Sequence, residues 1–419
     1  MSEKTVLPNG VRVITEEIGY VRSVSIGAWV ISGSRYEEDS IGGVAHFIEH
    51  MLFKGTTNRT AFDIAAAVDS VGGVLNAYTG KELTSFYAKV PDYYATEALD
   101  LLSDLLRNAL FDPVELEKEK FVVFQEIKMV EDTPDDAIHD FFEFHFWKDH
   151  PLRRSVLGSR ESVEALNRDG VIDFFSKRYH GRNLVISAAG NLKHGPFVEQ
   201  VERLLQLPAA EELPKAGNTP PPEATGDLFL QEKDLEQVHV LMGALGPHAA
   251  DEDRYPAMLV NMVLGGSMSS RLFQEIREKR GLVYSIHSFL VPYSDTGWFG
   301  IHFGTEGDRV REVAGLVSGE LRKLCRESLT GEEIRSGKEQ MKGSFLLSME
   351  STDVRMSRLA RNELTFGRQV PVEEVIRKID GITGEDIRRV TRWMLRPENL
   401  SMAVLGKVPG GVTRECLNG

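Results

Sequence analysis

The feature that most limits the possible folds is an internal repeat at about half the chain length. A segment in the middle of the chain and another near its end both combine a helical pattern, a short link, an Asn-Leu pair and an apolar strand that stops at glycine. Asn183 corresponds to Asn399 and Gly190 to Gly406, and both pairs are 216 residues apart. The repeat predicts one scaffold built twice.

The beginnings of the two halves also agree, because each has a strand, an acidic turn and a helix in the same order. Between them, residues 207–226 are rich in Pro, Ala and Glu and lack periodicity, which is typical of a linker. We predict homologous domains at 1–210 and 226–419, joined by a linker at 211–225. The predicted fold class is α+β, with a mainly antiparallel β-sheet packed against several α-helices in each domain.

Charge and cysteine content restrict the partners and the compartment. The net charge of −14 disfavours nucleic acid and anionic membranes as partners. Cys325 and Cys416 lie far apart and form no disulfide framework, which fits a reducing compartment. The N-terminus lacks a secretory pattern, and no apolar run reaches the length of a membrane span. We expect a cytoplasmic protein.

The first half contains polar residues within an otherwise apolar helical pattern. In GGVAHFIEHMLFKGT, residues 42–56, apolar side chains cover most of the helix circumference around His46, Glu49 and His50. These three residues are spaced i, i+3 and i+4, so they share one face. Buried ionisable groups are unfavourable unless they are paired, so we expect a partner opposite this face. The corresponding segment of the second half carries no such motif.

A metal ion is the partner that best fits these residue types. Two histidines one helical turn apart can bind one zinc ion, and a catalytic zinc site has three protein ligands and a water molecule. Glu49 shares the face and would accept a proton from that water. The pattern is the inverted form of the H-E-x-x-H zinc-protease motif. The alternative is a helix whose histidines form hydrogen bonds within the core.

The third ligand is expected in a helix that begins at Asp112, a predicted N-cap followed by proline. Glu126 has apolar neighbours there, where a solvated glutamate is unexpected, so we favour Glu126 as the ligand. Glu119 is seven residues earlier on the same face. From the residues alone, Glu119 either supports the ligands or is a solvated surface residue.

With His46, Glu49, His50 and Glu126 so arranged, the chain resembles the pitrilysin-type (inverzincin, M16) zinc peptidases over essentially its whole length. It is most similar to their mitochondrial-processing-peptidase-like branch of two-domain chains. The resemblance implies that His46, His50 and Glu126 bind one Zn²⁺ ion per chain and that Glu49 is the catalytic base. It also implies that the acidic residue at Glu119 supports catalysis.

A second part of the resemblance lies in GGSMSSRLFQEIREKRGLVYS, residues 265–285. Similar proteins have an Arg and a Tyr seven residues apart that bind the substrate backbone and stabilise the transition state, and here these match Arg277 and Tyr284. The metal-free domain would thus complete the substrate site. By itself the segment also fits an exposed charged helix face that ends at Gly281.

The segment LNAYTGKELTSFYAKV, residues 75–90, resembles the family's substrate-lining edge strand around Asn76 and Ala77. An edge strand can bind an extended peptide by adding it to the sheet. The alternative for this segment is an ordinary hairpin with a Thr-Gly turn.

The resulting expectation is a zinc endopeptidase that cleaves peptides or unstructured polypeptide segments. Because the family's longer members join four such domains, a two-domain chain is expected to form a homodimer whose site is completed across subunits. One alternative is a catalytically silent core subunit of a larger complex. Another is a peptide-binding module with a structural metal, which would need a fourth ligand. The remaining histidines in IHDFFEFHFWKDH, His139, His145 and His150, are interpreted as ordinary surface or core residues.

Overall fold

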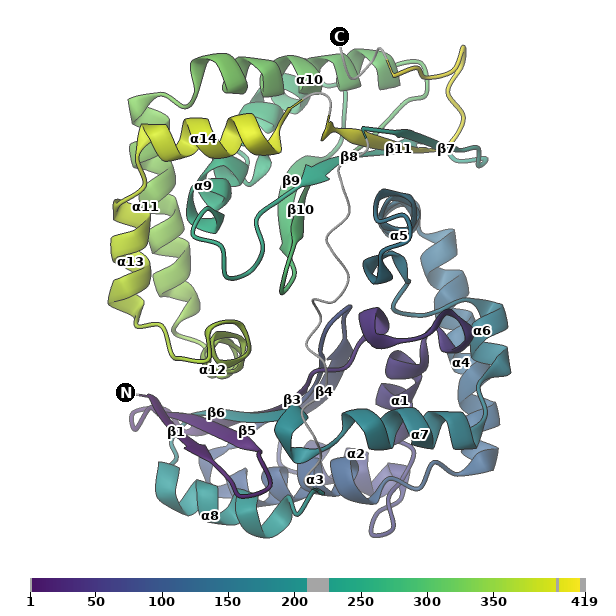
Figure 1. Ribbon diagram of the computed structural model, residues 1–419, viewed down its shortest axis with the longest axis vertical. Coiled ribbons are helices and arrows are strands. Elements are labelled where there is room, and N and C mark those ends of the chain that lie inside the picture. Colours follow the sequence, from purple (N-terminus) through teal and green to yellow (C-terminus); the bar gives the residue numbers. More distant parts are fainter. Residues whose placement is uncertain (1, 209–225, 397–398, 415–419) are drawn as a thin grey trace. The chain divides into compact units, whose positions relative to one another are not determined.

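The computed structural model describes residues 2–208, 226–396 and 399–414. The predicted linker at 211–225 lies outside the described residues, as does Cys416. The chain forms two compact units, each built around one β-sheet (Figure 1). Unit 1 contains residues 1–129, 154–215 and 347–369, and unit 2 contains 130–153, 216–346 and 370–419.

Unit 1 has a six-stranded sheet in the order β1-β2-β6-β3-β5-β4. Its neighbouring strands are antiparallel except for the parallel pair β2 and β6. The strands are β1 (Ser2–Val6), β2 (Arg12–Glu17), β3 (Ser23–Val30), β4 (Val74–Thr79), β5 (Thr84–Pro91) and β6 (Leu184–Gly190). The helices that belong wholly or mostly to this unit are α1 (Val44–Leu52), α2 (Ala61–Asp69), α3 (Ala95–Asn108), α4 (Pro113–Asp132), α6 (Arg160–Ala165), α7 (Arg168–Arg178), α8 (His194–Leu204) and α12 (Thr352–Phe366).

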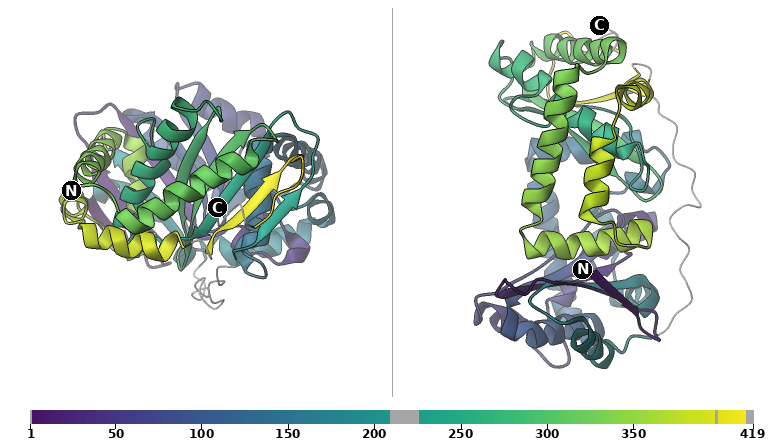
Figure 2. Two further views of the ribbon diagram at one scale, coloured as in Figure 1. Left: turned by 90° about the horizontal axis from the view of Figure 1, so that it is seen from above. Right: turned by 90° about the vertical axis from the view of Figure 1, so that its left-hand side faces the viewer.

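Unit 2 has a five-stranded sheet in the order β7-β11-β8-β10-β9, with β7 and β11 as its parallel pair. The yellow strand β11, from the end of the chain, lies beside strands from the middle of the chain (Figure 2). The strands are β7 (Leu228–Gln231), β8 (Val238–Leu245), β9 (Ile286–Pro292), β10 (Gly297–Thr305) and β11 (Ser401–Leu405). The helical segments are α5 (Pro134–Phe146), α9 (Arg254–Gly265), a π-helical segment (Phe273–Glu278), α10 (Val310–Glu327), α11 (Gly331–Ser348), α13 (Val372–Asp380) and α14 (Gly384–Met394).

The predicted repeat is present, because β2 to β6 and β7 to β11 follow the same strand order and the same parallel or antiparallel pairing. Gly190 and Gly406 occupy equivalent places at the ends of β6 and β11, with φ angles of 142° and 130°. A Cβ atom on Gly190 would lie 2.2 Å from the carbonyl oxygen of Ser23. These positions therefore require glycine. The α+β class and the mainly antiparallel sheets are confirmed.

The two units differ from the contiguous domains predicted at 1–210 and 226–419. Each sheet has two apolar faces, and a helix from the other half of the chain covers one of them. In unit 1, Met356 of α12 packs against β3 beside Gly27, where a Cβ atom would lie 2.4 Å from the methionine sulfur. In unit 2, Phe142 of α5 stacks on Trp298 of β10 at a centroid distance of 5.0 Å.

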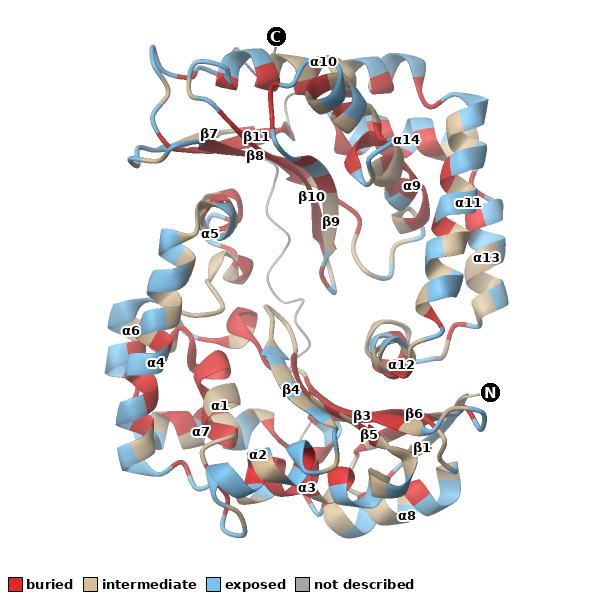
Figure 3. Ribbon diagram, turned by 180° about the vertical axis from the view of Figure 1, so that it is seen from behind, coloured by how far each residue is buried: buried red, intermediate tan, exposed pale blue. Residues whose placement is uncertain are grey.

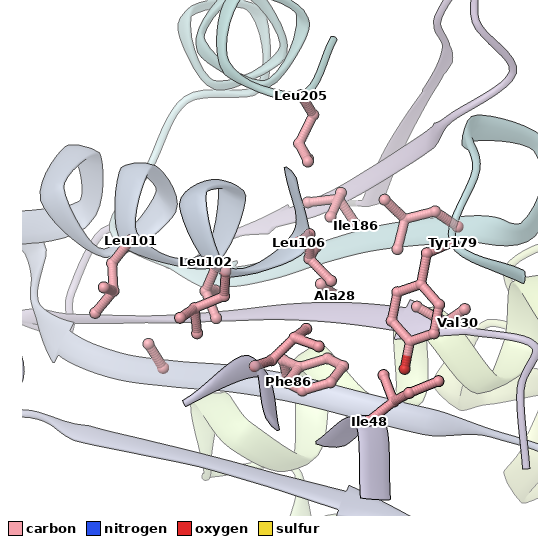
Figure 4. Packing of buried hydrophobic residues seen from close by; sticks show 14 of the residues in the cluster. Ala28, Val30, Ile48, Phe86, Leu101, Leu102, Leu106, Tyr179, Ile186 and Leu205 are labelled. Carbon is pink, nitrogen blue, oxygen red and sulfur yellow. The ribbon is translucent and has the colours of Figure 1, made fainter. Parts of the chain in front are cut away.

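The opposite face of the first sheet carries the larger core, to which α1 contributes. Phe86 of β5 lies close to Ile48 of α1 and to the ring of Tyr179 (Figure 4). The inner strands are almost entirely buried, whereas β4 at the edge alternates between exposed and partly buried residues (Figure 3). The core therefore fixes α1 beneath the exposed edge of the sheet. Within the described parts of the chain, no helix combines the length and apolarity needed to cross a membrane.

Candidate metal centre

Helix α1 is positioned by its N-terminus as well as by its apolar faces. Gly43 has a φ of 88°, and a Cβ atom there would lie 2.5 Å from the carbonyl oxygen of Leu157. The carboxylate of Glu37 accepts hydrogen bonds from the backbone N–H groups of Gly43 and Ala45, at 2.7 and 2.8 Å. A carboxylate at this end also suits the helix dipole. Sequence reasoning missed Glu37, because six and eight residues separate it from its partners and no local capping pattern contains it.

The sequence-predicted ligands His46, His50 and Glu126 lie together in unit 1. The two Nε2 atoms are 3.2 Å apart, and Glu126 Oε2 lies 3.6 Å from His46 Nε2 and 3.5 Å from His50 Nε2. A tetrahedral zinc ion with bonds of about 2.0–2.1 Å separates its ligand atoms by about 3.3 Å. The three atoms therefore match one face of such a tetrahedron, and the residues fit zinc.

Glu126 reaches this position because α4 begins where the sequence predicts. Asp112 Oδ1 accepts hydrogen bonds from the N–H groups of Val114 and Glu115, at 2.8 and 3.2 Å. Pro113 is the first residue of the helix. The N-cap prediction is confirmed, and it fixes the start of the helix that carries Glu126.

Glu119 is buried, with 3% of its surface exposed, so the interpretation of a solvated surface residue is wrong. Its two carboxylate oxygens contact His50 Nδ1 at 2.7 Å and Lys54 Nζ at 2.6 Å. When His50 donates its Nδ1 hydrogen to Glu119, the lone pair of the ring is on Nε2, the atom that faces Glu126. A carboxylate behind a histidine ligand orients the ring and makes it more basic.

Burial and the neighbouring charged groups together shift the pKa values of His46 and His50 in opposite directions. Burial and repulsion from His50 lower the pKa of His46 to about 4. Burial also acts to lower the pKa of His50, but hydrogen bonds to Glu119 and Glu126 outweigh it and raise this pKa to about 9. The hydrogen bond from His50 lowers the pKa of Glu126. Without a metal ion, the cluster therefore holds a proton on His50.

Glu49 lies on the same face of α1 and faces the end of β4. Its Oε2 accepts a hydrogen bond from the hydroxyl of Thr79, whose oxygen is also 3.3 Å from that of Thr84. Burial raises the pKa of Glu49, while the Thr79 hydrogen bond acts against it. A carboxylate with a raised pKa is suited to accept and return a proton near neutral pH.

The segment around Asn76 and Ala77 forms a hairpin strand at the edge of the sheet, whereas its role in lining the substrate stays a prediction. Among the strands that the structure describes, β4 pairs only with β5, and it forms one edge of the sheet. The N–H of Ala77 donates to the side-chain oxygen of Asn76 at 2.8 Å. The strand ends at Thr79, the residue that contacts Glu49.

Arg277 and Tyr284 lie together in unit 2. The guanidinium of Arg277 is 5.4 Å from the centroid of the Tyr284 ring and 4.6 Å from that of Phe273. Tyr284 is 79% exposed. Arg277 belongs to a π-helical segment, a rare form that often occurs at functional sites. The sequence predicts that a helix ends at Gly281. This is confirmed, because Gly281 has a φ of 61° and its N–H donates a hydrogen bond to the carbonyl oxygen of Arg277.

Comparisons with known proteins identify the family and agree with the fold. Residues 12–160 match the family model "Insulinase (Peptidase family M16)", and residues 165–341 match "Peptidase M16 inactive domain". An uncharacterized zinc protease of Bacillus subtilis is 39% identical over 97% of this chain and 98% of its own length. One of Streptomyces coelicolor is 39% identical over 96% of this chain and 89% of its own.

Among solved structures, a protease from Helicobacter pylori has a TM-score of 0.91 at 20% identity, covering 97% of this chain and 99% of its own. A peptidase M16 inactive domain from Pseudomonas fluorescens has a TM-score of 0.90 at 20% identity, covering 97% and 98%. The fold and the sequence similarity define a two-unit protein of the peptidase class, with relatives named zinc proteases. The chain belongs to peptidase family M16.

Proposed function

We propose that this protein is a zinc-dependent endopeptidase that cleaves peptides or unstructured polypeptide segments. The observation that carries the proposal is the spacing of His46, His50 and Glu126, whose ligand atoms lie 3.2 to 3.6 Å apart next to Glu49. These residues would hold one zinc ion and leave its fourth position open, as catalytic sites do. The names of the relatives support zinc as the metal.

The bound ion would supply Lewis acidity, which lowers the pKa of water and polarises a carbonyl group. Glu49 accepts the proton of the attacking water and passes it to the amine that leaves. Thr79 holds the Glu49 carboxylate by one oxygen. Glu119 acts as a positioning residue, because it contacts His50 rather than the reacting atoms.

We also propose that the substrate adds to β4 as an extended strand near Asn76 and Ala77. The edge position of β4 supports this role, since an edge strand offers unpaired backbone groups. The backbone donor of Ala77 would exchange its bond with Asn76 for one to the peptide. Because β4 ends at Thr79, an extended peptide would lead toward Glu49.

Arg277 and Tyr284 are proposed to bind the substrate backbone from unit 2 and to stabilise the oxyanion. We place them in the site of the other subunit of a homodimer. A mixture of Arg277→Ala and Glu49→Gln proteins should then recover part of the activity that each lacks. A monomeric protein with full activity would contradict this arrangement.

Cleavage mapping of a mixed peptide library by mass spectrometry tests the main proposal, with Glu49→Gln as the blank. This variant should retain zinc and lose cleavage, and cleavage by it would overturn the role of Glu49. A folded, zinc-loaded wild-type protein that makes no cuts would favour the second candidate, a silent core or peptide-binding subunit. The family model described as an inactive domain matches residues 165–341, a range that contains none of His46, Glu49, His50 and Glu126.

A further inference from the structure

A second group of metal-binding residue types lies in unit 2, on the face of the sheet that α5 covers. His239 of β8 and His302 of β10 are buried, with exposed fractions of 8% and 2%. Asp135, in the first turn of α5, directs its carboxylate at both rings. Gly304 is the cross-strand partner of His239, and a Cβ atom there would lie 3.6 Å from the imidazole.

The ring nitrogens that face Asp135 lack hydrogen bonds. His239 Nδ1 and His302 Nε2 lie 3.5 and 3.8 Å from Asp135 Oδ1, which is too long for a hydrogen bond. Both nitrogens are buried and have no hydrogen-bond partner among the described residues. Buried polar atoms are rarely left in this state, so their arrangement requires an explanation.

The surrounding groups favour neutral imidazoles with free lone pairs. The rings of His287 and His139 lie 5.4 and 5.7 Å from that of His302. Burial and these neighbouring histidines lower the pKa of His302 to about 3. Burial likewise lowers the pKa values of His239, His287 and His139. Near neutral pH the cluster therefore presents nitrogen lone pairs beside one carboxylate.

We propose that Asp135, His239 and His302 form a second binding site for a divalent transition-metal ion such as Zn²⁺. Their three ligand atoms lie within 4.8 Å of one another. Small side-chain rotations, for which the exposed Asp135 has freedom, would bring them to bonding distance. Imidazole and carboxylate ligands suit zinc and similar ions, whereas calcium and magnesium prefer oxygen alone.

An ion at this site would connect α5 to the sheet of unit 2, because its ligands come from both. Asp135 precedes His239 and His302 by more than a hundred residues, so the ion would join distant segments of the chain. Since the site does not exist in the unfolded chain, metal binding would stabilise the folded unit. The role inferred is structural, and it does not depend on the proposed peptidase activity.

The test uses the full chain with His46→Ala and His50→Ala, which removes the first site. Equilibrium dialysis against Zn²⁺, followed by elemental analysis, should give one zinc per chain. Adding Asp135→Asn should weaken this binding at least tenfold, whereas adding Asp136→Asn, at the exposed neighbouring position, should leave it unchanged. Zinc at one fixed concentration should raise the Tm of the Asp136→Asn protein by more than that of the Asp135→Asn protein.

Absence of zinc from the protein that lacks the first site would overturn the proposal. Equal zinc binding by the Asp135→Asn and Asp136→Asn proteins would overturn it too, by placing the ion elsewhere. Because the readout is bound metal, a protein without peptidase activity can still confirm this second site. Conversely, an active peptidase that binds a single zinc ion would reject it.

Discussion

Glu119 Oε1 lies 2.7 Å from His50 Nδ1, while Nε2 of the same ring faces Glu126. The contact with Glu119 keeps the hydrogen on Nδ1 and the lone pair on Nε2 of His50. The Nε2 atom is then able to bind a metal ion. A glutamine at position 119 could present its amide NH₂ to the ring and favour the other tautomer. The contact between Glu119 and His50 therefore links α4 to the chemistry of α1.

For Glu119→Gln we expect zinc affinity to fall by about 10- to 100-fold, because the carboxylate no longer orients His50. Competition with a chelator at fixed pH measures this change. Glu117→Gln is the matched control, since Glu117 is exposed on the same helix and pairs with Lys120. Equal affinities in the two variants would contradict the positioning role.

The affinity for zinc at the first site should rise with pH. His50 has a pKa of about 9 without metal, and the ion binds the deprotonated nitrogen, so a proton must leave. His46, with a pKa of about 4, is already neutral. Between pH 7 and pH 9 we expect about a tenfold gain per unit. Calorimetry in buffers of different ionisation enthalpy should show release of about one proton; no proton release would contradict this.

Thr79→Val should shift the acidic limb of the pH profile of kcat/KM to higher pH. The Thr79 hydroxyl stabilises the ionised form of Glu49, so its loss raises the pKa of this carboxylate further. Glu49 then stays protonated, and unable to act as a base, up to a higher pH. Thr79→Ser keeps the hydroxyl and should restore the wild-type profile. If the acidic limb of the Thr79→Val profile is not shifted, the Thr79 hydroxyl does not set the pKa of Glu49.

Glu37→Gln should destabilise the protein by about 1–3 kcal/mol, because an amide offers one acceptor oxygen where the carboxylate offers two. One of the N–H groups of Gly43 and Ala45 would lose its partner. Urea unfolding measures the effect. Glu38→Gln is the control, since Glu38 is exposed beside it in the sequence. Equal unfolding free energies would show that the cap contributes little.

The same residue predicts a pH dependence of stability. Burial raises the pKa of Glu37 from about 4.5 to about 7 in the folded protein. At a pH between 4.5 and 7, Glu37 is ionised in the unfolded chain but keeps its proton in the folded chain. The free energy of unfolding therefore falls as the pH rises through this range. The stability of wild type relative to Glu37→Gln should therefore decrease from pH 4.5 to pH 7. An increase would mean that the two backbone donors outweigh burial.

The sequence alone was sufficient to predict the repeat, the fold class and the three candidate metal ligands. The ligands His46 and His50 share a helix turn, and Glu126 differs from its apolar neighbours, so local spacing contains the signal. Glu119 was ambiguous, because position on a helix face does not tell whether another helix covers it. Its burial and its contact with His50 arise only when α4 packs against α1.

Features that depend on tertiary contacts were not predictable. Glu37 and Thr79 meet α1 through the fold, with no local pattern to mark them. His239 and His302 are 63 residues apart and become neighbours only through the pairing of β8 with β10. His139, interpreted as an ordinary residue, lies beside them. The sequence also did not predict that α5 belongs to unit 2 and α12 to unit 1, because these assignments depend on contacts between distant segments.

The placement of α12 has a consequence for biosynthesis. A ribosome completes all the strands of the first sheet by Gly190, but the helix that covers Ile14 and Trp29 begins only at Thr352. During the intervening synthesis, one apolar face of this sheet lacks its native cover. Such surfaces promote association with other chains. We therefore expect this face to be open to contacts with other chains until α12, which ends at Phe366, has emerged from the ribosome.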